Sequence, residues 1–196
     1  LILGIVGFVG AIQYFKYQRD AEIALMQSEY LAEDVDMLSF AESHSDEPLG
    51  GLAFISLADE HYNEGKPEEA AALYAKAFKA LNEGPLAGRA RLGEGFSLLA
   101  TADLEQGVSV LEALLNDDFQ LDVLRAEAAY HLAVHALSDG QIAVAREHLN
   151  TLDSFEYGGI WVLKSMNLRS YIESDDAASS VESAEDTQGD ASGTAS

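Results

Sequence analysis

Two histidines are the chain's clearest candidate for metal chemistry. His131 and His135 are four residues apart and Glu127 comes four residues earlier, so a helix would bring the three side chains to one face. Imidazole pairs at this spacing bind zinc in several enzymes. The Glu that a zincin motif places directly after its first His is missing here, and both histidines could equally lie between packed helices. We therefore expect no metal ion and no cofactor.

Other residue patterns point away from catalysis. The Lys of the GKPEE segment at Gly65 is not followed by Ser or Thr, so this segment is no phosphate loop. The paired carboxylates Glu68–Glu69 and Asp117–Asp118 have no apolar setting that would raise a pKa for acid catalysis. The absence of cysteine excludes thiol nucleophiles and Cys-ligated metals. We expect no enzymatic activity.

The charge of the chain limits its partners. Its 196 residues include 34 Asp and Glu against 11 Lys and Arg, a formal net charge of -23. This charge repels phosphate backbones, so nucleic acid is not expected as a partner. Hydrophobic residues make up 48% of the chain, which is enough for a folded core.

The first residues predict a membrane anchor. Residues 1–15 are uncharged and contain one polar side chain, Gln13; tyrosines with Lys16 and Arg19 then follow, as at a membrane interface. The apolar run is shorter than the roughly 20 residues of a spanning helix, so we expect its start to lie upstream of the sequence. A signal-peptide core is the alternative, but no small-residue cleavage site follows. We expect a transmembrane anchor over 1–19.

The last residues have the composition of a disordered tail. Residues 173–196 hold seven acids and no Lys or Arg, with a single apolar side chain larger than Ala. Such a segment cannot bury enough surface to offset its ordering entropy. The remaining body is acidic too, since residues 20–172 hold 27 acids and nine bases. We divide this body into a connecting helix at 20–48 and a repeat domain at 49–172.

The body reads as a repeated pair of helices. It is rich in Ala, Leu and Glu, and three segments superpose at spacings of 37 and 38 residues. Each has a small residue in its first helix, another at the turn and a third in its second helix, which allows antiparallel helices to pack closely. These residues are Ala58, Gly65 and Ala70, then Gly95, Ala102 and Gly107, then Ala133, Gly140 and Ala145. Larger side chains are expected to form the core, namely Leu57, Tyr74, Leu98, Leu111, Leu132 and Leu149.

The first segment resembles a tetratricopeptide repeat. It carries, in order, Phe54, Leu57, Ala58, Gly65, Ala70, Tyr74 and Ala77, and the other two segments are degenerate versions of it. We therefore predict an all-α fold. It has an N-terminal transmembrane helix, a tetratricopeptide-like helical-hairpin solenoid of about three repeats, and a C-terminal capping helix.

The order of anchor, long helix and first repeat over residues 1–172 resembles the YfgM-like family, an ancillary subunit of the bacterial SecYEG translocon. The resemblance implies a single-pass protein of the bacterial inner membrane with its repeat domain in the periplasm. It implies three kinds of partner: the SecYEG translocon, a PpiD-like periplasmic chaperone, and unfolded secretory proteins. Lys16 and Arg19 alone would favour a cytoplasmic domain. We follow the family, because residues upstream could carry more positive charge.

The first helices of stacked hairpins line the concave side of a solenoid, where a peptide could bind. One inward stripe gives nine residues, called the groove residues below: Ile55, Asp59, Tyr62, Arg89, Leu92, Phe96, Glu127, Tyr130 and Val134. The alternative is that Leu92, Phe96 and Tyr130 pack between neighbouring repeats.

Residues 157–172 are expected to form the capping helix. They repeat an apolar spacing at Ile160, Leu163, Asn167 and Tyr171, and they hold the chain's one tryptophan, Trp161, which we assign to the core. A solenoid needs such an element over its exposed end.

We expect a membrane-anchored repeat protein that binds proteins at the Sec translocon and assists secretory protein export or recruits periplasmic chaperones. The alternative is a structural scaffold for another envelope or cytoplasmic assembly.

Overall fold

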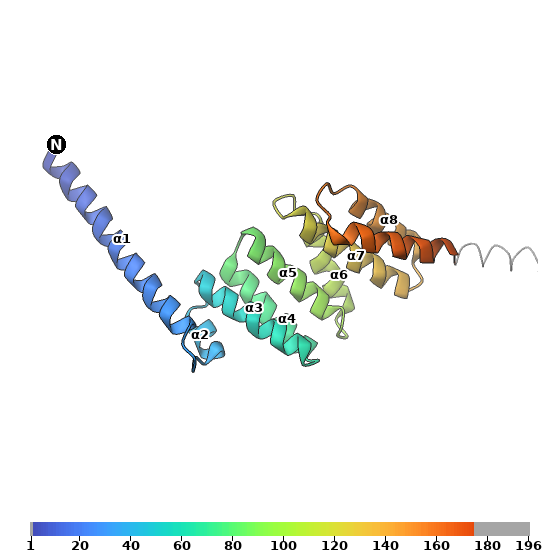
Figure 1. Cartoon of the computed structure of the whole chain (residues 1–196), viewed down its shortest axis with the longest axis horizontal. Helices are drawn as coiled ribbons and strands as arrows, with labels where there is room; N and C mark the ends of the chain where they lie inside the picture. The colour runs from blue at the N-terminus through green and yellow to red at the C-terminus, as the bar shows by residue number, and fades with distance from the viewer. Residues whose placement is uncertain (1, 175–196) are drawn as a thin grey trace, which may run out of the picture. The chain divides into compact units, whose positions relative to one another are not determined.

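The computed structural model describes residues 2–174, with side chains from residue 13 onward. Over these residues the chain forms nine helices and no strand, which confirms the all-α prediction (Figure 1). The ninth helix covers residues 160–174. The others are α1 (Ile2–Tyr30), α2 (Met37–Ser43), α3 (Pro48–Asn63), α4 (Pro67–Leu81), α5 (Gly84–Leu98), α6 (Leu104–Leu115), α7 (Asp122–Ser138) and α8 (Ile142–Asp153).

The chain divides into two compact units, Leu1–Gly93 and Glu94–Ser196, called unit 1 and unit 2 below. Unit 1 contains α1 to α4 and the first part of α5. Unit 2 contains the end of α5, α6 to α8 and the helix at 160–174.

The structure describes the predicted anchor and tail only in part. The backbone of residues 2–19 belongs to α1, but the side chains of residues 1–12 are not described. Among the helices that the structure describes, none has the length and apolar character needed to cross a membrane. Of the predicted tail at 173–196, residues 175–196 lie outside the described range.

The segment 20–48 is not one continuous helix, so the predicted connecting helix needs correction. Helix α1 ends at Tyr30, and a non-helical stretch precedes α2. The backbone N–H and the hydroxyl of Ser39 both donate to the Asp36 carboxylate, which caps the start of α2. Asp36 therefore begins a new helix, and Pro48 begins α3 in turn.

The three expected helix pairs are present. The turns between α3 and α4, α5 and α6, and α7 and α8 lie at the positions that the small residues mark. Gly65 and Gly140 close the first and third turns at φ values of 76° and 72°, a region that suits glycine. Helical hairpins at these spacings are consistent with a helical-repeat solenoid.

The small residues lie where paired helices touch. Ala58 and Ala70 are fully buried in unit 1, as are Ala133 and Ala145 in unit 2. The larger residues assigned to the core are buried too, except that Leu57 is only partly covered at the edge of the unit 1 core. The spacing of the small residues thus predicted the helix contacts correctly.

The helix at 160–174 packs on α7 and α8, as Figure 1 shows in orange-red. Ile172 joins Ala133 and Leu149 in one core cluster of unit 2. Arg169 donates to the Asp153 carboxylate at 2.7 Å and to the Asn150 amide oxygen at 3.1 Å. A terminal helix of the expected kind is therefore present.

Candidate functional site

A polar cluster joins three helices of unit 1. The Tyr74 hydroxyl of α4 donates a hydrogen bond to the Asp59 carboxylate of α3. Arg89 of α5 donates to the same oxygen, Oδ1, over 2.8 Å. The guanidinium carbon of Arg89 also lies 5.5 Å from the centre of the Tyr74 ring. One carboxylate oxygen thus ties both helices of the first hairpin to the first helix of the second.

The charges of this cluster are fixed at neutral pH. Burial, helped by the hydrogen bond to Asp59, raises the pKa of Tyr74 to about 12. Burial, the largest single effect, would lower the pKa of Arg89, but the Asp59 charge and the interactions with Tyr74 and Asp59 together outweigh it, so the net shift is upward. Tyr74 therefore stays a neutral donor and Arg89 a cation. Both side chains of the Asp59–Arg89 pair remain about two-fifths exposed, so a partner can reach them.

The other groove residues of unit 1 divide between core and surface. Ile55 is 8% exposed and Leu92 is 4% exposed, so both belong to the packed interior. Tyr62 is half-buried, and burial raises its pKa. The stripe expected from the sequence therefore offers three side chains to a partner in this unit: Asp59, Tyr62 and Arg89.

Unit 2 holds a cluster of aromatic rings around His131. The His131 ring lies 4.5 Å from the Phe96 ring of α5 and 5.4 Å from the Trp161 ring, centre to centre. Tyr130 lies 5.2 Å from Trp161, and the Lys164 ammonium lies 4.0 Å from the centre of the Trp161 ring. Trp161 is only 9% exposed, in agreement with its assignment to the core.

The two histidines lie beside different carboxylates. Burial, with a smaller contribution from the Lys164 charge, lowers the pKa of His131 to about 4. Glu127 is 4.0 Å away, at the limit of an ion pair, whereas the nearest carboxylate to His135 is that of Asp139 at 3.7 Å. No group of three potential ligands that could hold a metal ion is found among the described side chains.

The remaining groove residues of unit 2 lie at the surface of α7. Glu127 and Tyr130 are partly buried, and Val134 is 39% exposed. Phe96 and Tyr130 both take part in the aromatic cluster, so part of each ring packs between helices. The alternative interpretation, packing between neighbouring helices, therefore applies to part of each side chain.

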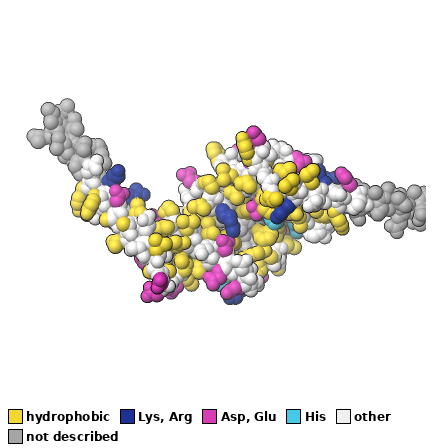
Figure 2. All heavy atoms as spheres, viewed as in Figure 1, with side chains coloured by type: hydrophobic (Ala, Val, Ile, Leu, Met, Phe, Trp, Pro, Cys, Tyr) yellow, Lys and Arg dark blue, Asp and Glu magenta, His cyan; other side chains and the backbone are white. Residues whose placement is uncertain are grey.

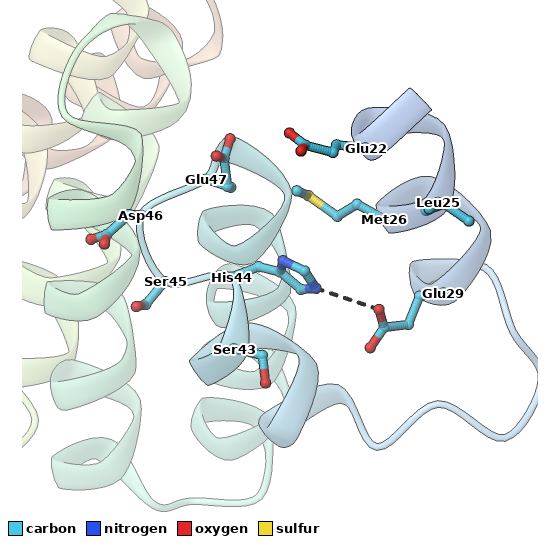
Figure 3. Close-up of a pocket in the computed structure, with 9 residues that line it drawn as sticks. All are labelled: Glu22, Leu25, Met26, Glu29, Ser43, His44, Ser45, Asp46 and Glu47. Atoms are coloured by element: carbon cyan, nitrogen blue, oxygen red, sulfur yellow. Dashed lines mark hydrogen bonds and ion pairs between the residues drawn. The ribbon is translucent and has the colours of Figure 1, made fainter. Parts of the chain in front are cut away.

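A third feature, not expected from the sequence, is an open cleft of about 480 Å³ in unit 1 (Figure 3). It lies between the end of α1 and the loop that joins α2 to α3. Figure 3 shows Glu22, Met26 and Glu29 of α1 extending towards this loop. His44 Nε2 lies 3.4 Å from the Glu29 carboxylate and bridges the cleft.

The loop beside this cleft rests on Gly50. A Cβ at Gly50 would overlap the backbone carbonyl of His44, so only glycine allows this approach. The centre of the His44 ring lies 4.6 Å from that of the Phe40 ring, and the Phe40 ring lies 5.4 Å from the Tyr30 ring at the end of α1. Gly50 was the one residue in the sequence that could have indicated this close contact. The contact is with a loop, however, and the path of a loop cannot be predicted from a periodic pattern.

Comparison of the chain with protein-family models, with curated proteins and with solved structures gave no match. The resemblance to the YfgM-like family therefore stays a prediction.

Proposed function

We propose that this chain is a membrane-anchored helical-repeat protein that binds other proteins at the Sec translocon of the bacterial inner membrane. Its repeat domain would act in the periplasm, by binding rather than by catalysis. The observation that carries the proposal is the Asp59–Arg89 contact of 2.8 Å, which brings the first helices of two hairpins together with their polar side chains exposed.

The surface along these first helices suits protein recognition. In unit 1, Tyr62 of α3 supplies an aromatic ring and Arg89 of α5 supplies a cation. In unit 2, the 4.5 Å contact between Phe96 and His131 brings α5 beside α7, with Tyr130 next to it. Tyrosine and arginine are common among residues that dominate binding energy at protein interfaces.

The nature of the partners follows from charge and from the family resemblance. A net charge of -23 disfavours nucleic acid and leaves proteins as the natural class of partner. The order of anchor, connecting segment and repeats supports SecYEG, a PpiD-like periplasmic chaperone and unfolded secretory proteins. Extended chains of secretory proteins would contact the aromatic rings, and acidic side chains among them would pair with Arg89.

Site-specific photocrosslinking tests this proposal. A benzophenone side chain replaces Tyr62, Phe96 or Tyr130 in the full chain within native membranes. Phe119, an aromatic residue that is 96% exposed outside the first helices, is the matched control position. We expect adducts with translocon subunits, chaperones or emerging chains at the three groove positions and few at Phe119. Equal adduct yields at all four positions would contradict the proposal.

The identity of the adducts also separates the two candidate functions. Adducts confined to other envelope or cytoplasmic proteins would favour a structural scaffold and contradict the translocon assignment. Protease treatment of intact spheroplasts tests the membrane orientation independently. We expect the repeat domain to be digested without lysis; digestion only after lysis would refute the periplasmic location.

A further inference from the structure

Lys164 lies at the edge between the inner and outer faces of the helix at 160–174. On the inner face Trp161 is 9% exposed and belongs to the core of unit 2. On the outer face Ile160 and Leu163, which follow the apolar spacing seen in the sequence, are 56% and 60% exposed. Figure 2 shows hydrophobic side chains gathered over this helix. Lys164 is therefore an exposed cation among apolar side chains.

The Lys164 ammonium is held over two aromatic rings. Its nitrogen lies 4.0 Å from the centre of the Trp161 ring and 5.8 Å from the centre of the Tyr130 ring on α7. The centres of these two rings are 5.2 Å apart, and Tyr130 is one of the groove residues. A cation over the face of an aromatic ring is attracted by the ring electrons. The ammonium is thus positioned beside the groove before any ligand binds, which lowers the entropy cost of a contact with it.

Lys164 lies apart from the carboxylates of its own chain. Among the described residues, none forms an ion pair with it, although the chain holds 34 Asp and Glu. Two other cations of unit 2 differ in this respect: Arg125 pairs with Asp118 and Arg169 pairs with Asp153, each at 2.7 Å. The residues three and four positions from Lys164 along its helix are uncharged. Its ammonium can therefore pair with a carboxylate from outside the chain.

His131 adds no second positive charge to this cluster at neutral pH. Burial, helped by the Lys164 charge, lowers the pKa of His131 to about 4, so its ring is neutral. The centre of that ring lies 5.4 Å from the centre of the Trp161 ring. The Glu127 carboxylate lies beside His131, 4.0 Å from Nε2, and not beside Lys164. The positive charge of the aromatic cluster is therefore that of Lys164.

We propose that Lys164 gives the groove a preference for one kind of segment, by binding the side-chain carboxylate of an Asp or Glu that apolar residues flank. This inference rests on the proposed function, because it names a chemical feature of the proteins that the groove would bind. The apolar flanks would pack on Tyr130 and on Val134, which lies one turn further along α7 and is 39% exposed.

The charges favour this kind of ligand. A hydrogen bond between an ammonium and a carboxylate is stronger than one between neutral groups. A segment with a single carboxylate adds little to the repulsion from a chain of charge -23, and salt screens that repulsion beyond about 10 Å. A strongly acidic segment would be repelled, so one acid among apolar residues fits best.

Peptide binding to the full chain in nonionic detergent tests the proposal. Two short capped peptides of Ser and Val carry either Glu or Gln between two central leucines, and fluorescein on each peptide reports binding by anisotropy. Trp161 is the only tryptophan of the chain, so a change in its emission with unlabelled peptide places the ligand at this cluster. We expect the Glu peptide to bind about three-fold more tightly than the Gln peptide. The difference should shrink as salt is added.

Three variants show whether Lys164 supplies this preference. Lys164→Gln should bind the two peptides equally, whereas Lys164→Arg should keep the preference for the Glu peptide. Lys79→Gln is the matched control, because it makes the same charge change at an exposed lysine of unit 1, and it should keep the full preference. Circular dichroism checks that each variant keeps its helices.

The possible failures are distinguishable. Equal binding of the two peptides by the natural chain would overturn the role of Lys164 and leave peptide binding by the groove intact. A preference that persists in Lys164→Gln would also overturn it, since another cation would then be its source. If neither peptide binds, or if binding leaves the Trp161 emission unchanged, the proposed function fails for the groove residues of unit 2, and this inference fails with it.

Discussion

Gly107 in α6 packs against the backbone of Gly95 in α5. A Cβ at Gly107 would lie 3.1 Å from the Gly95 carbonyl oxygen and 2.9 Å from the backbone nitrogen of Leu99. Both neighbours are backbone atoms and cannot move aside as a flexible side chain does. Helices α5 and α6 can therefore approach this closely only because Gly107 has no side chain.

Gly107→Ala should destabilise unit 2 even though alanine favours helices. Helix propensity alone would stabilise the variant by about 1 kcal/mol. Overpacking against a fixed backbone costs about 1–3 kcal/mol and should outweigh this gain. Urea unfolding followed by circular dichroism measures the net change. Gly65→Ala is the control, because no atom lies within 4 Å of its Cβ position and only its positive φ is strained. A Gly107→Ala variant more stable than the natural chain would contradict the close-packing argument.

The Tyr74 hydroxyl should contribute to the stability of unit 1. Tyr74→Phe removes the hydrogen bond to Asp59 while the ring stays buried. Asp59 keeps Arg89 and some water, so we expect a loss of about 1 kcal/mol in the free energy of unfolding. Tyr157→Phe, at a residue that is 70% exposed, should have no measurable effect and serves as the control.

A double-mutant cycle locates this contribution. The effect of Tyr74→Phe should shrink when Asp59 is already replaced by Asn, because the strong acceptor is then gone. Equal effects of Tyr74→Phe in both backgrounds would mean that the hydroxyl does not act through Asp59.

His131 should make unit 2 less stable in acid. Its pKa is about 4 in the folded chain against an ordinary value of 6.5, so the unfolded state takes up the proton first as the pH falls. The stability contributed by the neutral ring is complete above about pH 6.5 and is lost as the pH falls towards 4. Between pH 7 and pH 5 this loss should amount to about 2 kcal/mol.

His131→Phe isolates that contribution from the carboxylates that titrate nearby. The variant keeps an aromatic ring against Phe96 and Trp161 and removes the titrating group. We expect its free energy of unfolding to fall less than that of the natural chain over pH 7 to 5. Parallel pH profiles for the two proteins would show that His131 takes up its proton equally in both states.

The hairpins were predictable from sequence because their signals are local. Gly65 and Gly140 end helices in a conformation that suits glycine, and small residues at a fixed spacing mark where two helices touch. Asp59 and Arg89 were placed on one stripe for the same reason, and the structure brings them to 2.8 Å. Such features can be predicted from the period of the helix and from the spacing between the sequence repeats.

Other features depend on neighbours that periodicity does not reveal. The helix at 160–174 has apolar residues on both faces, so spacing alone could not decide whether Leu163 or Leu168 meets the core. The break before α2 follows from the Asp36 cap, a polar signal within an otherwise helical pattern. The cleft beside α1 depends on the path of a loop. In each case a tertiary contact or a single cap outweighs the average pattern.

Gly50 should control how firmly the end of α1 is held in unit 1. In Gly50→Ala the new methyl group overlaps the His44 carbonyl, so the loop that carries His44 must move away from α3. The contact of 3.4 Å between His44 and Glu29 should then be lost, together with part of the packing of Tyr30 on Phe40. We expect faster cleavage by a Glu-specific protease at Glu33, in the non-helical stretch after α1. Gly65→Ala is again the control: it strains a positive φ but crowds no atom, and Gly65 follows the other end of α3, so cleavage at Glu33 should match that of the natural chain. Unchanged cleavage at Glu33 in Gly50→Ala would show that the loop does not hold α1.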